Sequence, residues 1–322
     1  MRRTNILTLT VNPALDVAVV APSVRPTHKI RTSGAQYDPG GGGINVARVM
    51  HELGGEALAL FASGGATGKF IEELLRAAAV PCQAVPVSGV TRISFNARDQ
   101  SSGLDYRFVP KGPQLSPSDK ESLLAALSDI EAKWLVASGS LPPGADMDFY
   151  AGLARRAAER GQRFVLDTSG PALISALGQG IDVLKVSLGE FEQIVGREVR
   201  DLASQRTQAS ALVRSGAARK IVVTLGAEGA LLVTGDEALH LPAIAVVEKS
   251  LAGAGDSFLA GLVLGLDRGC SDLAAMQLAS ATAAAAVTSP GTARVGHMAV
   301  QALLPAGWLE ANQGVLRPPL RS

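Results

Sequence analysis

The sequence predicts an α/β fold: a parallel sheet covered by helices on both faces, with a small second sheet projecting from it. Two observations indicate this fold. Short apolar runs rich in β-branched residues alternate with longer Ala- and Leu-rich stretches over most of the chain, and this alternation is typical of parallel sheets. One internal region instead alternates strictly between apolar and polar residues, as a half-exposed strand does.

The first pattern predicts six strands and eight helices, taken in chain order. Strands are expected at 6–11, 57–62, 134–137, 164–166, 183–186 and 221–225. Helices are expected at 44–53, 68–79, 117–130, 148–160, 189–195, 202–215, 255–266 and 271–287. The tail from Pro305 onward contains Pro and Arg and is expected to be loosely held.

The second pattern predicts a β-hairpin with a Gly-containing loop. Its apolar positions are Ile93, Phe95, Ala97, Leu104, Tyr106 and Phe108. Residues 28–37 are expected to add a further exposed strand, so the small sheet forms a lid whose apolar face must be covered by the body, by a closing cleft or by a partner chain. The expected lid comprises 17–37 and 91–110, and the expected α/β body comprises 1–16, 38–90 and 111–322.

The composition is that of a folded chain with nearly balanced charge. Of the 322 residues, 47% are hydrophobic and 18% are charged, which excludes disorder for the bulk of the chain. The 30 Lys and Arg residues nearly equal the 29 Asp and Glu residues, which argues against a protein that coats nucleic acid or is attracted to membranes. Two cysteines are too few for a disulfide framework or a structural zinc site.

Targeting segments are not expected. The longest apolar run, 258–266, is shorter than a membrane helix requires. The apolar stretch after the basic start soon meets Asn12, Pro13 and Asp16, which favours a strand over a signal peptide. We therefore expect a cytoplasmic protein.

Polar residues and glycines gather where the predicted strands end. The segments concerned are 12–16, 138–144, 167–169 and 224–229, together with Lys185 within its strand. Because ligands of open parallel sheets bind beyond the carboxyl ends of the strands, these segments predict one long groove.

The most unusual segment is the run of four glycines at 40–43, followed by Ile44 and Asn45. Such a run lets the backbone approach a ligand closely and leaves free N–H groups at a helix start, where Asn45 could bind a hydroxyl or a phosphate. It is not a good dinucleotide fingerprint, because Val46 stands where Gly or Ala is needed. The segment Gly64–Lys69 is also not a Walker A motif, since it has one residue too few and lacks the Ser or Thr after Lys69.

The segment 250–257 predicts the reaction centre. Gly253, Ala254 and Gly255 expose successive N–H groups at a helix N-terminus, which is an anion site, and Asp256 stands beside them. Phosphoryl transfer needs both parts, amides for the transferring phosphate and a base for the attacking alcohol. The alternative is that Asp256 only caps the helix.

Basic residues of the expected lid could hold a phosphate already present on the substrate. Lys29 and Arg31 are placed on one candidate strand and Arg92 at the start of another. Arg107, on the return strand of the hairpin, is interpreted as a surface residue, because exposed edge strands carry such cations for solubility.

Segments 40–48, 138–144 and above all 252–257 resemble the ribokinase-like (phosphofructokinase B) family of sugar kinases, over nearly the whole chain to about Thr292. The glycine run followed by Ile-Asn-Val-Ala-Arg is similar to the bacterial minor 6-phosphofructokinase branch. The resemblance implies a ribokinase-like three-layer α/β/α sheet with a β-sheet lid. It also implies a homodimer in which the lids of the two subunits pack together.

The resemblance also implies roles for individual residues. Asp256 would be the general base, with Gly253, Ala254 and Gly255 as the anion hole. The phosphosugar would be bound by Asp16, Lys29, Gly40, Gly41, Asn45, Arg92 and Ser140. The ATP site would be lined by Lys185, Ser187, Thr224, Gly226 and Gly229. A monovalent cation such as K⁺ would be bound, largely by backbone carbonyls, at Ser250, Ala252, Ala286, Ser289, Gly291 and Ala293.

Two positions depart from the family pattern. Its Asn-x-x-Glu motif, tied to Mg²⁺ and phosphate, appears here as Ser187 followed by Glu190, so Glu190 is the expected Mg²⁺ residue and Ser187 is a shorter ligand than Asn. The usual Asn near position 289 is Ser289, a change that a cation held by backbone oxygens would tolerate.

The expected activity is ATP-dependent phosphorylation of the C1 hydroxyl of fructose 6-phosphate. The alternatives are a kinase for tagatose 6-phosphate, fructose 1-phosphate or an unphosphorylated sugar. Outside the kinases, a nicotinamide oxidoreductase is disfavoured by the poor glycine fingerprint, and a sugar-phosphate-binding regulator is disfavoured by the intact segment 253–256.

Overall fold

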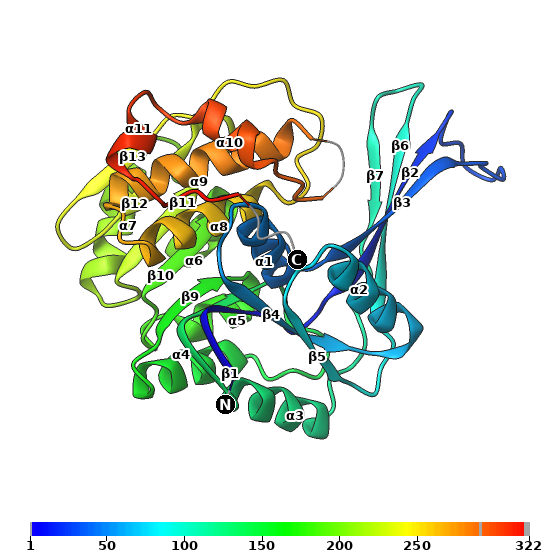
Figure 1. Cartoon of the computed structure of the whole chain (residues 1–322), viewed down its shortest axis with the longest axis horizontal. Helices are drawn as coiled ribbons and strands as arrows, with labels where there is room; N and C mark the ends of the chain where they lie inside the picture. The colour runs from blue at the N-terminus through cyan, green and yellow to red at the C-terminus, as the bar shows by residue number, and fades with distance from the viewer. Residues whose placement is uncertain (1, 290–291, 319–322) are drawn as a thin grey trace.

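The computed structural model describes residues 2–289 and 292–318 of the chain. Within these residues the chain forms two sheets (Figure 1). The larger has nine strands in the spatial order β13-β12-β11-β10-β9-β8-β1-β4-β5, and the smaller has four in the order β3-β2-β6-β7. The smaller sheet projects from one side of the body.

The strands of the larger sheet are β1 (Arg2–Thr10), β4 (Ala57–Ser63), β5 (Cys82–Pro86), β8 (Ile130–Ser138), β9 (Arg163–Asp167), β10 (Val183–Ser187), β11 (Lys220–Thr224), β12 (Ala230–Val233) and β13 (Ala238–Leu241). The strands of the smaller sheet are β2 (Ala14–Ala21), β3 (Ser33–Gly40), β6 (Arg92–Asp99) and β7 (Asp105–Phe108).

The helices are α1 (Gly42–Glu52), α2 (Gly65–Ala77), α3 (Pro117–Ser128), α4 (Phe149–Glu159), α5 (Gly170–Ala176), α6 (Leu188–Val195), α7 (Leu202–Arg214), α8 (Ala254–Asp267), α9 (Asp272–Val287), α10 (His297–Leu303) and α11 (Trp308–Ala311), with one 3₁₀ turn, η1 (Gly226–Glu228).

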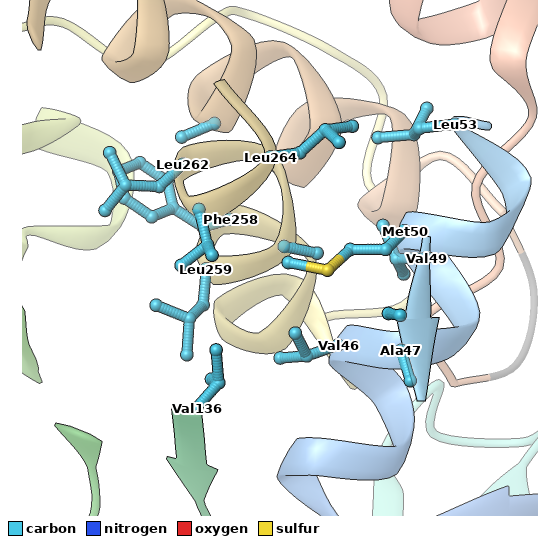
Figure 2. Close-up of a cluster of buried hydrophobic side chains, with 14 of the residues drawn as sticks. Val46, Ala47, Val49, Met50, Leu53, Val136, Phe258, Leu259, Leu262 and Leu264 are labelled. Atoms are coloured by element: carbon cyan, nitrogen blue, oxygen red, sulfur yellow. The ribbon is translucent and has the colours of Figure 1, made fainter. Parts of the chain in front are cut away.

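Two hydrophobic cores lie on the two faces of the larger sheet, which confirms the predicted three layers. Successive residues of a strand point to opposite faces: Trp134 and Val136 of β8 enter the core formed with α1, α2, α8 and α9, while Leu135 and Ala137 enter the core formed with α3 to α7. In the first core, Val136 lies below Leu259 of α8, and Val46 of α1 faces the same helix (Figure 2).

The predicted parallel arrangement is confirmed for the six strands that the sequence indicated, and two strands that it did not indicate extend one edge. Every neighbouring pair from β11 to β5 runs parallel. β12 and β13 add to this edge in antiparallel direction, because a short turn suffices to join antiparallel neighbours. Besides β12 and β13, the sequence prediction missed β2, β5, α5, α10 and α11.

Two further predictions are wrong. Ile130 begins β8 rather than ending a helix. The tail is not loosely held over its described part, because Trp308 and Val315 are buried in the first core and the Trp308 indole N–H donates to the Ala274 carbonyl at 3.2 Å.

The smaller sheet contains the predicted hairpin, with Phe95 opposite Phe108 and Ala97 opposite Tyr106. β2, which was not predicted as a strand, begins at Ala14, and β3 ends at Gly40, so both include residues that were expected to belong to the body. The strand expected at 28–37 begins only at Ser33, so Lys29 and Arg31 lie in the preceding segment and not on a strand. The division of the chain into body and lid stays a prediction.

Over the described residues, none of the helices combines the length and the apolar character that crossing a bilayer demands.

Candidate active site

Asp256 lies in the first turn of α8, which begins after Gly253. Gly253 has φ 79°, and a Cβ at this position would lie 2.7 Å from the backbone nitrogen of Ala293, so glycine is required for both conformation and space. The first amides of a helix have no partner within the helix. The turn 253–255 therefore points N–H groups out of the helix end that carries Asp256, although the Ala254 N–H also donates to Leu251 at 3.3 Å.

Asn45 is brought to Asp256 from the first turn of α1. Its Nδ2 donates to Oδ2 of Asp256 at 2.8 Å. The two residues are 211 positions apart, and α1 packs directly against α8. The structure therefore joins the two segments that the sequence singled out independently.

Lys185 lies beneath the turn at the start of α8. It is buried, and its Nζ donates to both carboxylate oxygens of Asp167 at 3.1 Å. A Cβ on Gly255 would come within 2.9 Å of the same Nζ. Burial lowers the pKa of Lys185, but the Asp167 and Asp256 carboxylates outweigh it and hold the pKa above its ordinary value. Lys185 is thus a permanent cation under the predicted anion site.

The pKa of Asp256 is raised to about 6. Burial is the largest cause, and the nearby Asp167 carboxylate adds to it, whereas the hydrogen bond from Asn45 and the charge of Lys185 oppose it. A carboxylate with this pKa is largely ionised at neutral pH and is a stronger base than an exposed aspartate, which suits it to accept a proton from an alcohol.

Asp16 lies on β2, on the side of the smaller sheet that faces this site. Burial raises the pKa of Asp16, and a hydrogen bond from Ser94 opposes the effect. A Cβ on Gly40 would overlap the Asp16 carboxylate, so the glycine leaves room for that side chain.

The other glycines of the run serve close packing. Gly41 has φ 120°, and a Cβ on Gly43 would lie 2.6 Å from the Leu9 carbonyl oxygen. A Cβ on Gly42 would overlap Ser138. The N-terminus of α1 is thereby pressed against the carboxyl ends of β1 and β8, which brings Asn45 to the centre of the site.

The basic residues predicted to bind the phosphate of the substrate lie in different environments. Arg92 lies near Asp16, and its guanidinium donates to the carbonyls of Asn12 at 2.9 Å and Pro110 at 2.8 Å. Arg107, interpreted as a surface residue, is exposed and also close enough to affect the Asp16 carboxyl. Lys29 and Arg31 are exposed, and over the described part of the chain neither forms a hydrogen bond or an ion pair with Asp256.

Ser140 follows β8 and is exposed at the site. Its Oγ accepts from Asn12 Nδ2 at 3.4 Å. The preceding turn is fixed because the Gly139 carbonyl accepts from the hydroxyls of Tyr150 at 2.8 Å and Thr168 at 3.0 Å.

The residues predicted for ATP lie at the ends of β10 and β11. Thr224 ends β11, and Gly226 is open to solvent, since a Cβ there would meet no atom within 4 Å. Gly229 has a packing role, because a Cβ at this position would overlap the Leu241 carbonyl of β13.

Ser187 and Glu190 form a capping box at the start of α6. One carboxylate oxygen of Glu190, Oε2, accepts from both the backbone N–H and the hydroxyl of Ser187 at 2.8 Å. The other oxygen remains for a ligand. The described residues contain no group of three or more His, Cys, Asp or Glu side chains arranged to hold a metal ion.

The predicted cation residues lie on two neighbouring segments. The Ser250 N–H donates to the Val287 carbonyl at 3.2 Å, and the Ala293 N–H donates to the Ala252 carbonyl at 3.3 Å. Ala286 lies in the last turn of α9, where its carbonyl accepts from the Ser289 N–H at 3.1 Å, and Ser289 follows the helix, which ends at Val287. Gly291 lies outside the described residues.

Sequence reasoning missed three contributors to this site. Asp167 was noticed only as a strand end, and Arg48 and Asp38 were not selected. Arg48 lies one turn after Asn45 on α1, so helical periodicity could have indicated it. The contact of Asp38 with Arg294 at 2.8 Å joins positions 256 apart, and no local pattern in the sequence predicts it.

Together these groups place a base with a raised pKa beside helix amides and a buried cation, at the carboxyl ends of parallel strands. Such a site can take a proton from an alcohol while it stabilises negative charge on a phosphoryl group.

A family model described as pfkB family carbohydrate kinase matches residues 12–296. An ATP-dependent 6-phosphofructokinase isozyme 2 from Mycobacterium tuberculosis is 41% identical over 290 residues, which cover 89% of this chain and 85% of the relative. The Escherichia coli protein of the same name is 37% identical over 294 residues, 91% of this chain and 95% of the relative. A 1-phosphofructokinase from Rhodobacter capsulatus is 34% identical over 283 residues, 81% of this chain and 85% of the relative.

Solved structures agree with this similarity. Escherichia coli phosphofructokinase-2 in complex with potassium superposes with a TM-score of 0.89 at 36% identity, covering 93% of this chain and 98% of the other. The same enzyme in complex with fructose-6-phosphate gives a TM-score of 0.88, with the same identity and coverage. A Thermotoga maritima ribokinase, with a TM-score of 0.75 at 19% identity over 93% of this chain and 99% of the other, shares the fold.

Proposed function

The chain belongs to the pfkB family of carbohydrate kinases, and on this premise we propose that it is an ATP-dependent 6-phosphofructokinase. It transfers the γ-phosphoryl group of ATP to the C1 hydroxyl of fructose 6-phosphate and forms fructose 1,6-bisphosphate and ADP. The observation that carries this proposal is Asp256, with its raised pKa, in the amide-bearing turn after Gly253 and hydrogen-bonded to Asn45. The similarity to 6-phosphofructokinases supports the choice of sugar.

In the reaction, Asp256 accepts the proton of the C1 hydroxyl as the C1 oxygen forms its bond to the γ-phosphorus. The bond between that phosphorus and the β–γ bridging oxygen breaks, and ADP leaves. The amides of the turn 253–255 and the buried Lys185 stabilise the negative charge on the transferring group. Asp16 and Asn45 hold the sugar, together with Gly40, Gly41 and Ser140.

Arg92, with Lys29, binds the phosphate that the substrate already carries. The proximity of Arg92 to Asp16 supports this role. The exposed Arg107 lies near the same carboxylate and adds positive charge to that end of the site.

The nucleotide lies over the ends of β10 and β11, against Lys185, Ser187, Thr224, Gly226 and Gly229. Mg²⁺ fits here, because this ion is held by one or two carboxylates together with substrate phosphates, and Glu190 retains one oxygen outside its capping box. Bound Mg²⁺ supplies neutralisation of the phosphate charge.

A monovalent cation such as K⁺ fits between residues 250–252 and the described residues 286–289 and 293. Hydrogen bonds join the two segments, and the C-terminal end of α9 adds carbonyls with partial negative charge. Among the described residues, the donors would be Ser250, Ala252, Ala286, Ser289 and Ala293. Ala293 lies close to Gly253, so the cation would support the turn at Gly253.

The active enzyme is a homodimer through the smaller sheet. On one face of this sheet, Tyr37, Ile93 and Phe108 are 45%, 44% and 60% exposed. Phe70 of α2 packs edge-on against Tyr37 at 5.7 Å and covers only part of this face. The opposite face carries Asp16 and Asp38 and looks toward the site, so closing the cleft would leave the apolar face in water, whereas a second subunit would cover it.

An assay of ADP release with a panel of sugars tests the proposed function. The panel contains fructose 6-phosphate, tagatose 6-phosphate, fructose 1-phosphate and fructose. We expect the highest kcat/KM for fructose 6-phosphate. A higher value for another member of the panel would reassign the substrate, and tight sugar binding without turnover would contradict a kinase.

A further inference from the structure

Arg48 forms a bridge between the smaller sheet and the residue that contacts Asp256. Its Nη1 donates to the Asn45 side-chain Oδ1 at 3.2 Å, to the Pro39 carbonyl at 3.1 Å and to the Thr292 carbonyl at 3.3 Å. Its Nη2 lies 3.6 Å from Asp38 Oδ1. The Arg48 side chain is 13% exposed and that of Asp38 is 6% exposed, so this guanidinium is held within the protein.

These contacts decide which way the Asn45 amide points. An arginine can only donate hydrogen bonds, and an ionised carboxylate can only accept them. With Oδ1 turned to Arg48, Nδ2 must face Asp256, as the 2.8 Å contact shows. If the amide were turned over, its oxygen would face the Asp256 carboxylate and its NH₂ would face the guanidinium, and both contacts would be repulsive.

We propose that Arg48 is a positioning residue for the phosphoryl transfer: it fixes the Asn45 amide in the orientation that donates to Asp256. This inference rests on the proposed role of Asp256 as the base. The anchors of Arg48 come from three parts of the chain: its own helix α1, strand β3 through Asp38 and Pro39, and the segment after α9 through Thr292. Through Arg48, the orientation of the base therefore depends on the position of the smaller sheet relative to α1.

Arg294 provides a matched comparison. It donates to the same Asp38 Oδ1 at 2.8 Å, and its side chain is 51% exposed. Among the described residues, the side-chain hydrogen bonds of Asn45 are those with Asp256 and Arg48, and Arg294 forms none with it. Loss of Arg294 removes a cation from Asp38 and leaves the Asn45 amide held.

The experiment is a double-mutant cycle on kcat, at saturating fructose 6-phosphate and ATP, with Arg48→Met, Asn45→Ala and the double variant. We expect Arg48→Met to lower kcat about tenfold in the wild-type background and less than twofold in the Asn45→Ala background, because Arg48 acts through Asn45. Arg294→Met is expected to change kcat less than twofold. If Arg48→Met fails to fold by circular dichroism, Arg48→Lys replaces it in the same cycle.

Two results would overturn the inference. One is an equal loss from the Arg48 substitution in both backgrounds, which would make its role structural. The other is a loss in Arg294→Met as large as in Arg48→Met, which would assign the effect to the charge of Asp38. A wild-type protein that phosphorylates no sugar of the panel, or an Asp256→Asn variant that stays active, would instead remove the proposed function, and this inference with it.

Discussion

At Asp256 the chain keeps an acidic side chain in a place that disfavours its charge. Removal from water raises the pKa, and the neighbouring Asp167 raises it further. Lys185 does not cancel this effect, because both carboxylate oxygens of Asp167 already accept hydrogen bonds from its Nζ. The result is a carboxylate that is ionised at neutral pH and still basic.

The same pKa predicts how Asp256→Asn changes stability with pH. The pKa is raised in the folded state from 3.8 to about 6, so above pH 6 the ionised group destabilises the fold by about 3 kcal/mol. The penalty declines as the pH falls through 6 toward the unfolded pKa of 3.8 and vanishes well below that value, where the group is protonated in both states. We expect the free energy of unfolding of Asp256→Asn, relative to wild type, to rise by about 2–3 kcal/mol between pH 4 and pH 7.5 in urea titrations.

A difference between the two proteins that stays constant over this pH range would contradict the raised pKa. Asp201→Asn is a control, since hydrogen bonds from Ser204 lower the pKa of this helix-capping carboxyl. For this variant we expect the opposite sign, a relative loss of stability as the pH rises.

Arg92→Ala is expected to raise the KM for fructose 6-phosphate at least about tenfold and to change kcat less, because the side chain binds a part of the substrate that does not react. Steady-state kinetics with fructose 6-phosphate as the varied substrate measure both constants. Arg98→Ala is the control on the same strand, since Arg98 is exposed and pairs with Asp105 at 2.8 Å. An unchanged KM in Arg92→Ala would remove Arg92 from the phosphate site.

Sequence alone identified the residues whose chemistry is unusual in their local setting. Asp256 after Gly253 and Asn45 after a glycine run are such residues, and the structure brings them together. Arg48 was missed although it lies one turn after Asn45 on the same helix, and Asp167 was noticed only as a strand end. Asp38 was missed because its contact with Arg294 joins distant parts of the chain. The placement of Lys29 on a strand was wrong, because the segment before Ser33 does not pair.

At the scale of the elements, the position of α1 depends on how closely its glycines approach β1 and β8. A methyl group on Gly43 would lie 2.6 Å from a backbone carbonyl that a central strand holds in place. The strand cannot yield without disturbing the sheet, so the helix would have to move away and take Asn45 with it.

A pair of glycine-to-alanine substitutions tests this. Gly43→Ala is expected to lower the free energy of unfolding by at least about 2 kcal/mol, in the range of overpacked cores. Gly152→Ala in α4 is the control, because a Cβ there meets no atom within 4 Å, and we expect it to stabilise the protein by about 0.5–1 kcal/mol. Thermal unfolding measures both changes. Equal effects of the two substitutions would show that close packing does not require glycine at position 43.

The central elements could be predicted because their period and length were distinctive. β5 and β13 were missed because they are edge strands that are only partly buried, so their sequences, CQAVP and ALHL, form no continuous apolar run of β-branched residues. β12, with the sequence ALLV, has four residues of which only one is β-branched. The antiparallel edge depends on Gly229 and its close approach to β13, which is a tertiary contact that the sequence does not display.

At the scale of the whole molecule, the smaller sheet presents a polar face to the site and an apolar face to solvent. Phe108→Asp and Ile93→Asp place a charge on the apolar face, and we expect either to convert a dimer to monomers in sedimentation velocity. Met147→Asp is the control, since Met147 is 64% exposed on the body before α4, and it is expected to leave the dimer intact. A wild-type protein that sediments as a monomer at micromolar concentration would contradict the proposed interface.

The most direct test of the proposed mechanism is the kcat of Asp256→Asn with fructose 6-phosphate and ATP, measured together with sugar binding by calorimetry. We expect kcat to fall by a factor on the order of 10² or more, as for loss of a general base, while the dissociation constant for fructose 6-phosphate changes less than fivefold. A kcat within tenfold of wild type, with binding intact, would contradict the role of Asp256 as the base.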